Sequence, residues 1–157
     1  NLHRMILERY GRIYVRSRGD TYGTGSDVFI IDAQTDRVTG NLGIAASEMC
    51  LSGDSIYMTS VEWSYVTESN TITYALYDVK QNKIVSRNFI TDGTETEITI
   101  PYGRAVNPET KEIFVTEAKS YVVPGYLYCF SPEGKKRWKV RAGDIPAHFA
   151  FTTKTFQ

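Results

Sequence analysis

The sequence has no excess of charge of either sign and no long apolar run. Its 157 residues include 18 lysines and arginines and 18 aspartates and glutamates, so no overall field would draw the chain to nucleic acid or to an anionic membrane. No segment approaches the roughly 18 consecutive apolar residues that a membrane helix needs, which predicts no direct membrane insertion. The first residues also lack the basic and then apolar layout of a signal peptide, so we expect any export signal to lie outside this sequence.

Cysteine and histidine are scarce. The two cysteines, Cys50 and Cys129, lie in predicted strands of different repeats without metal-binding spacing, which favours two free thiols over a disulfide. The two histidines, His3 and His148, form no His-x-x-x-His pair and have no carboxylate cluster beside them. Phosphate-binding glycine loops and the Gly-x-Ser-x-Gly nucleophile motif are absent as well. The sequence therefore predicts no metal, no cofactor and no catalytic residue.

Helical patterns are also missing. No segment shows a 3.6-residue apolar period, and glycine or proline interrupts most windows, so helix should be scarce. With 41% apolar and 13% aromatic residues, the chain can nevertheless furnish a core. These features predict an all-β fold.

One pattern occurs three times along the chain. A polar turn precedes Ile-Tyr-Val at 13–15, Ile-Tyr-Met at 56–58 and Ile-Phe-Val at 113–115, and a polar loop follows each. A second apolar run comes next, at 28–31, 74–77 and 127–130, and then a tight turn and one more strand. We predict three four-stranded antiparallel meanders, at approximately 3–43, 44–93 and 98–143, and an extra strand at 145–152.

The spacing of these repeats is typical of β-propeller blades. The repeated aromatic residues Tyr14, Tyr57 and Phe114 are 43 and 57 residues apart, and blades of four strands recur every 40 to 50 residues or so. The runs at 28–31 and 127–130 are apolar at every position, as expected of strands covered on both faces. Because rings hold about four to eight blades, three blades predict part of a larger ring or a homodimer that shares one. A β-sandwich is the alternative fold.

The repeats resemble the YVTN-type β-propeller family, and within it the surface-layer-like propellers of the bacterial cell envelope. Its Ile-Tyr-Val-Thr core is matched at 13–15, 56–59 and 113–116, and its Val-x-Val-Ile-Asp-x-x-Thr-x-x-Val pattern is matched closely at 28–38. The third repeat is similar to the last blades of Bacteroides-type secreted propellers. The resemblance implies an exported binding protein, periplasmic or on the cell surface, and it brings no catalytic residues with it.

Three long loops, at 16–27, 60–71 and 117–125, follow the Ile-Tyr-Val strands and should emerge on one face of the ring. Each combines aromatic and charged residues, which suits flat polar partners such as sugars and peptides. His148, on the extra strand, would line the central channel as a general base, a metal ligand or a structural hydrogen-bonding group. The candidate binding residues are Arg16, Arg18, Tyr22, Glu62, Trp63, Tyr65, Lys119, Tyr121 and His148.

These residues lead to two functional hypotheses. The first is a non-catalytic binding protein of the cell envelope, whose partner is a glycan, a peptide or an envelope protein. The second is a propeller enzyme of the lactonase, lyase or glycosidase type acting at the central channel, because fold alone does not decide between the two. The alternative interpretation of the loop residues is structural: they only pack each loop onto the neighbouring blade.

Overall fold

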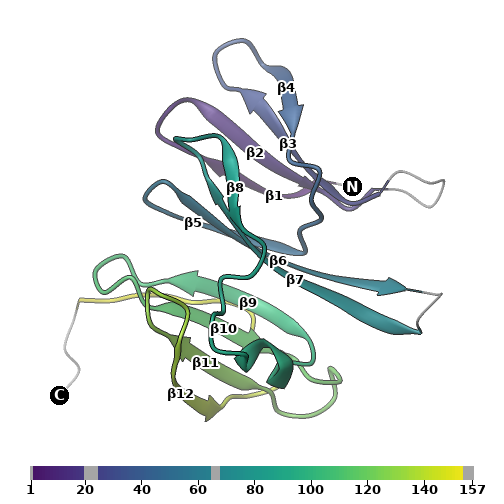
Figure 1. Ribbon diagram of the computed structural model, residues 1–157, viewed down its shortest axis with the longest axis vertical. Helices are drawn as coiled ribbons and strands as arrows, with labels where there is room; N and C mark the ends of the chain where they lie inside the picture. The colour runs from purple at the N-terminus through teal and green to yellow at the C-terminus, as the bar shows by residue number, and fades with distance from the viewer. Residues whose placement is uncertain (1, 20–24, 65–67, 154–157) are drawn as a thin grey trace. The chain divides into compact units, whose positions relative to one another are not determined.

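The computed structural model describes residues 2–19, 25–64 and 68–153. They form twelve strands and one short 3-10 helix, which confirms the all-β prediction (Figure 1). The chain divides into two compact units, Asn1–Thr91 and Asp92–Gln157. Two of the predicted site residues, Tyr22 and Tyr65, lie outside the described residues.

The first unit contains two four-stranded antiparallel sheets, and in each sheet every strand pairs with the next one along the chain. The first sheet consists of β1 (Leu2–Leu7), β2 (Arg12–Ser17), β3 (Asp27–Asp32) and β4 (Arg37–Asn41). The second sheet consists of β5 (Glu48–Ser52), β6 (Ser55–Ser64), β7 (Ser69–Asp78) and β8 (Lys83–Ser86). The predicted meanders are therefore present in this unit.

Alternate residues of these strands form one core between the two sheets. The first sheet contributes Ile6, Tyr14, Val28 and Ile30, and the second contributes Met49, Ile56, Met58, Ala75 and Tyr77. The ring of Tyr14 meets that of Tyr77 edge-on, with the centroids 5.6 Å apart. Burying one large apolar side chain stabilises a fold by about 1.5–3 kcal/mol. This shared core therefore holds both sheets of the unit together.

The second unit contains one sheet of the same kind. A 3-10 helix (Thr94–Glu97) precedes β9 (Pro101–Val106), β10 (Ile113–Glu117), β11 (Tyr126–Phe130) and β12 (Lys136–Arg141), which pair in chain order. Asn107 shapes the turn after β9, because its Oδ1 accepts from the backbone N–H groups of Glu109 at 2.9 Å and Thr110 at 3.1 Å. The third predicted meander is therefore present as well.

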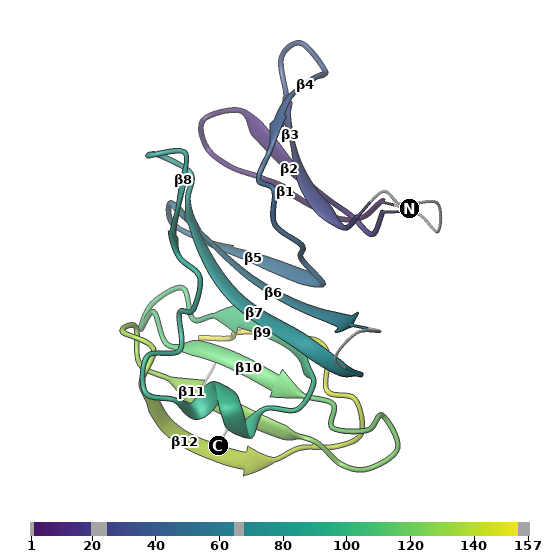
Figure 2. The same cartoon turned by 45° about the vertical axis from the view of Figure 1, so that its right-hand side comes forward.

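The predicted loop at 60–71 is mostly strand. β6 and β7 stay paired from Ser55↔Asp78 to Ser69↔Ser64, so they form a long hairpin that extends beyond β5 and β8 (Figure 2). The β6–β7 hairpin contains β-branched residues, including Val61, Thr71 and Ile72, which favour the extended backbone. Glu62 and Trp63 consequently lie on a strand.

The extra strand predicted at 145–152 is not formed. The segment is irregular, and the backbone of Ile145 is left-handed, with φ of 45°. Its side chains nevertheless cover the third sheet, because the rings of Phe149 and Phe151 lie 6.1 and 5.8 Å from that of Phe114. A strand requires a hydrogen-bonding neighbour, and in the described residues no strand pairs with this segment.

Both cysteines are free thiols, as predicted. Cys50 is partly buried, whereas Cys129 on β11 is fully buried. Burial and the neighbouring carboxylate of Glu112 raise the pKa of Cys129 to about 11. The thiol of Cys129 is therefore protonated at neutral pH and serves as a small apolar core group.

Candidate functional site

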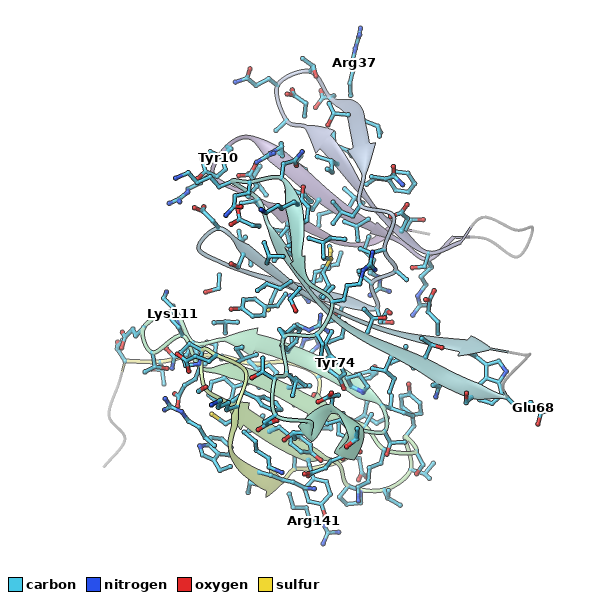
Figure 3. The ribbon with its side chains drawn as sticks, in the orientation of Figure 1. Tyr10, Arg37, Glu68, Tyr74, Lys111 and Arg141 are labelled. Atoms are coloured by element: carbon cyan, nitrogen blue, oxygen red, sulfur yellow. The ribbon has the colours of Figure 1, made fainter. Side chains whose placement is uncertain are left out.

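The first unit has two chemically different ends. At the turn end, short turns join β1 to β2, β5 to β6 and β7 to β8; at the loop end, the chain passes from β2 to β3 and from β6 to β7. Figure 3 shows Tyr10 at the turn end and Glu68 at the tip of the β6–β7 hairpin on the opposite side. Charged residues are present at both ends.

At the turn end, both carboxylate oxygens of the buried Glu8 accept hydrogen bonds. The Glu8 side chain is 1% exposed, and it accepts from the backbone N–H groups of Tyr10 at 2.6 Å and Arg12 at 2.9 Å. Arg12 Nε also donates to Glu8 Oε1 at 3.0 Å. The guanidinium then reaches the second sheet, where Nη1 donates to Asn82 Oδ1 at 3.3 Å and Nη2 donates to the carbonyl of Val79. Arg12 therefore ties the two sheets together.

At the loop end, three arginines come together, and among the described residues only one of them has an ion pair. Arg16 lies directly opposite Arg4 in the β1–β2 register, and Arg18 follows two residues later. Arg4 pairs with Glu48 of β5, with 2.8 Å between Nη1 and Oε1. We call Arg4, Arg16 and Arg18, with Glu48, the arginine cluster.

Arg16 is the unusual member of the cluster. It is 6% exposed, yet within the ranges that the structure describes its Nε has no hydrogen-bond partner. None of the ion pairs among the described residues includes it either. Burial lowers the pKa of Arg16 from its usual value; Glu48 opposes this effect, whereas Arg18 and Arg4 add to it. Within the described part of the chain, the cluster thus holds a buried positive charge that forms no ion pair of its own.

Ser60 is a second unsatisfied group at this end. It follows Ile56 and Met58 by alternation along β6, so it belongs to the face of the second sheet that turns toward the first sheet. Its hydroxyl is buried and has no partner among the described residues. Arg16 follows Tyr14 by the same alternation on the facing sheet. Both polar groups therefore belong to the inward faces near the loop end.

The structure brings only some of the predicted site residues together. Arg16 and Arg18 share the arginine cluster, whereas Glu62 and Trp63 are exposed on opposite faces of the β6–β7 hairpin. The remaining described candidates, in the second unit, are Lys119, Tyr121 and His148.

These three residues show ordinary surface contacts. Lys119 Nζ lies 4.5 Å from the ring centroid of Tyr126, and the rings of Tyr121 and Tyr102 are 6.0 Å apart. His148 is exposed on the irregular segment. Nothing in these contacts identifies a ligand-binding site.

Arg4 and Glu48 are members of the cluster that sequence reasoning did not find. They lie outside the Ile-Tyr-Val repeat and its loops, on the first strand of each sheet. The strand register could have located Arg4, because a residue near the start of β1 must lie opposite the end of β2 in an antiparallel hairpin. The pair between β1 and β5 requires knowledge of how the sheets pack.

In the described ranges, no three histidine, cysteine, aspartate or glutamate side chains gather in a way that could hold a metal ion. The helix in those ranges is too short to cross a membrane. A comparison of the sequence with protein-family models and with curated proteins finds no match.

Proposed function

We propose that this chain is a non-catalytic binding domain of the bacterial cell envelope, which holds a glycan, a peptide or an envelope protein at the loop end of its first unit. The observation that carries the proposal is the buried guanidinium of Arg16, whose Nε has no hydrogen-bond partner among the described residues. A buried charge without a partner costs stability. Groups that lower stability in this way are commonly kept because a ligand uses them.

Retention on defined glycan and peptide arrays tests this proposal. The wild-type chain should retain a ligand, and the Arg16→Met variant should lose it, because methionine fills similar space without the positive charge. Arg37→Met is the matched control, since Arg37 is exposed at the β3–β4 turn (Figure 3). No retained ligand, or equal retention by the Arg16 variant, would contradict the proposal.

We also propose that the sheets stack as blades of an exported β-propeller. On the first sheet, Leu7, Ile13, Ile31 and Val38 form one cross-strand row, and Met5, Val15 and Phe29 form another. The same register positions on the second sheet are held by Leu51, Ile56, Tyr77 and Ile84, and by Met49, Met58 and Ala75. The rows of the second sheet pack against the first sheet, which supports a further sheet covering the equivalent rows of the first.

The β1 positions of these rows on the first sheet are exposed, although Val15 within them is buried. Met49 is fully buried and Leu51 packs against the core, whereas their equivalents Met5 and Leu7 are 69% and 63% exposed. A sheet of a second copy is the occupant that we propose, which gives a homodimeric ring.

Light scattering of the chain measures this association. The wild type should form a dimer that Leu7→Glu dissociates and Arg37→Glu leaves intact, because only Leu7 lies in the apolar row. A wild-type chain that stays monomeric up to about 100 μM would contradict the shared ring.

A further inference from the structure

We propose that Arg16 binds a terminal oxyanion, a carboxylate or a phosphate, of the ligand at the loop end. The inference rests on the proposed function and names the chemical group that the arginine cluster recognises. The geometry of the guanidinium supports this inference. The fork of N–H groups on arginine matches the two oxygens of a carboxylate or phosphate, and such bidentate pairs are strong and directional.

The burial of Arg16 limits the size of the group that can reach it. Its Nε is sealed from solvent, so the residual 6% exposure of the residue belongs to other atoms. A group that approaches such a site must be small and must project from the end of a larger molecule. A terminal carboxylate or phosphate has that form, whereas an internal backbone phosphate, flanked by its chain on both sides, does not.

The charge balance of the cluster limits the number of anionic groups. Arg4 pairs with Glu48, and among the described residues Arg16 and Arg18 have no ion pair of their own. Both act on the same site, because Arg18 lowers the pKa of Arg16. A carboxylate therefore offsets one of these two charges and a phosphate offsets up to both, whereas a second anionic group would be repelled by Glu48.

Ser60 supplies a hydrogen-bond donor that fits the same ligand. Its buried hydroxyl belongs to the face opposite Arg16 and has no partner in the described part of the chain. The Ser60 hydroxyl and Arg16 Nε are both sealed from solvent, so binding requires the side chains that cover them to move. A hydroxyl donates readily to an anionic oxygen, and an oxyanion admitted in this way would satisfy Ser60 and Arg16 Nε together. One ligand group would thus resolve both unsatisfied atoms.

Calorimetric titration of the full chain with glucuronate, acetate and inorganic phosphate tests the inference, with glucose as the uncharged control. We expect an oxyanion to bind with a dissociation constant of about 1 mM, and glucose not to bind. Arg16→Met should weaken this binding at least about tenfold and Ser60→Ala about threefold, while Arg37→Met leaves it unchanged. Circular dichroism confirms that each variant is folded.

The outcomes separate this inference from the proposed function. Binding of glucuronate and acetate without phosphate identifies a carboxylate site, and binding of phosphate alone identifies a phosphate site. If no oxyanion binds, or if Arg16→Met binds equally well, the inference is wrong. An array ligand that depends on Arg16 would then still support the proposed function, whereas oxyanion binding without any array ligand would support only the inference.

Discussion

Two arginines on the same strand have opposite surroundings. Arg12 and Arg16 both project from β2 toward the second sheet, one at the turn end and the other at the loop end of the first unit. Arg12 pairs with Glu8 and donates to two acceptors of the second sheet. Arg16 is more deeply buried, yet its Nε has no acceptor among the described residues.

The difference separates a role in folding from a role in binding. Every contact of Arg12 is internal, so the fold itself accounts for its presence. Among the described residues, no hydrogen bond or ion pair of its side chain accounts for Arg16; Arg4 and Arg18 lower its pKa, and Glu48 raises it. We infer that the contacts at the turn end stabilise the fold and that the loop end is the surface that binds a ligand.

The largest effect is expected at the turn end. Arg12→Met should lower the free energy of unfolding by about 3 kcal/mol, because it leaves the buried carboxylate of Glu8 without its counterion. Urea unfolding measures the loss, with Arg37→Met as the control. A loss below about 0.5 kcal/mol would show that Arg12 contributes no more to stability than a surface residue does. Arg12 and Arg16 would then not differ in their role in folding.

Tyr14 lies between the two arginines on β2 and makes the stability of the first unit depend on pH. Burial first, and then the neighbouring Tyr77, raise the pKa of Tyr14 above its usual value of 10.0. The folded state therefore holds this proton more tightly than the unfolded state. The resulting stability is complete below about pH 10 and is lost as the pH rises toward the higher folded value.

Tyr14→Phe should remove this pH dependence. Its hydroxyl has no partner in the described ranges, so the variant should match the wild type at pH 7. Above pH 10 the wild type should lose up to about 1.4 kcal/mol per pH unit more than the variant. Parallel stability profiles from pH 8 to 11 for the two proteins would show that Tyr14 does not titrate in this way.

A small effect is expected from the exposed ion pair at the turn end. Arg9 Nη2 lies 2.5 Å from Asp54 Oδ2, and the Arg9 side chain is 64% exposed. Asp54→Asn should lower the free energy of unfolding by less than about 1 kcal/mol, since solvent screens such pairs. If Asp54→Asn lowered the free energy of unfolding as much as Arg12→Met, exposed ion pairs rather than buried contacts would stabilise the turn end.

The sequence predicted the sheets better than it predicted the site. The Ile-Tyr-Val repeat sets which residues are buried, and its period of two is a local property that can be read directly. Arg16 was a candidate because the sequence predicted it in a loop, whereas the structure places it on β2. Its pairing state depends on Glu48, which is distant in sequence. Segment 145–152 has the composition of a strand, and only the structure shows that it lacks a pairing neighbour.

The stability of Arg16→Met in the absence of ligand tests the binding role of Arg16 most directly. If Arg16 is kept for binding, removal of its buried, unpaired charge should leave the free energy of unfolding unchanged or raise it. Urea unfolding of the variant and the wild type, in a buffer without carboxylate or phosphate, measures the difference. Equal or higher stability is the predicted result, and a loss of more than about 1 kcal/mol would show that Arg16 serves the fold as Arg12 does.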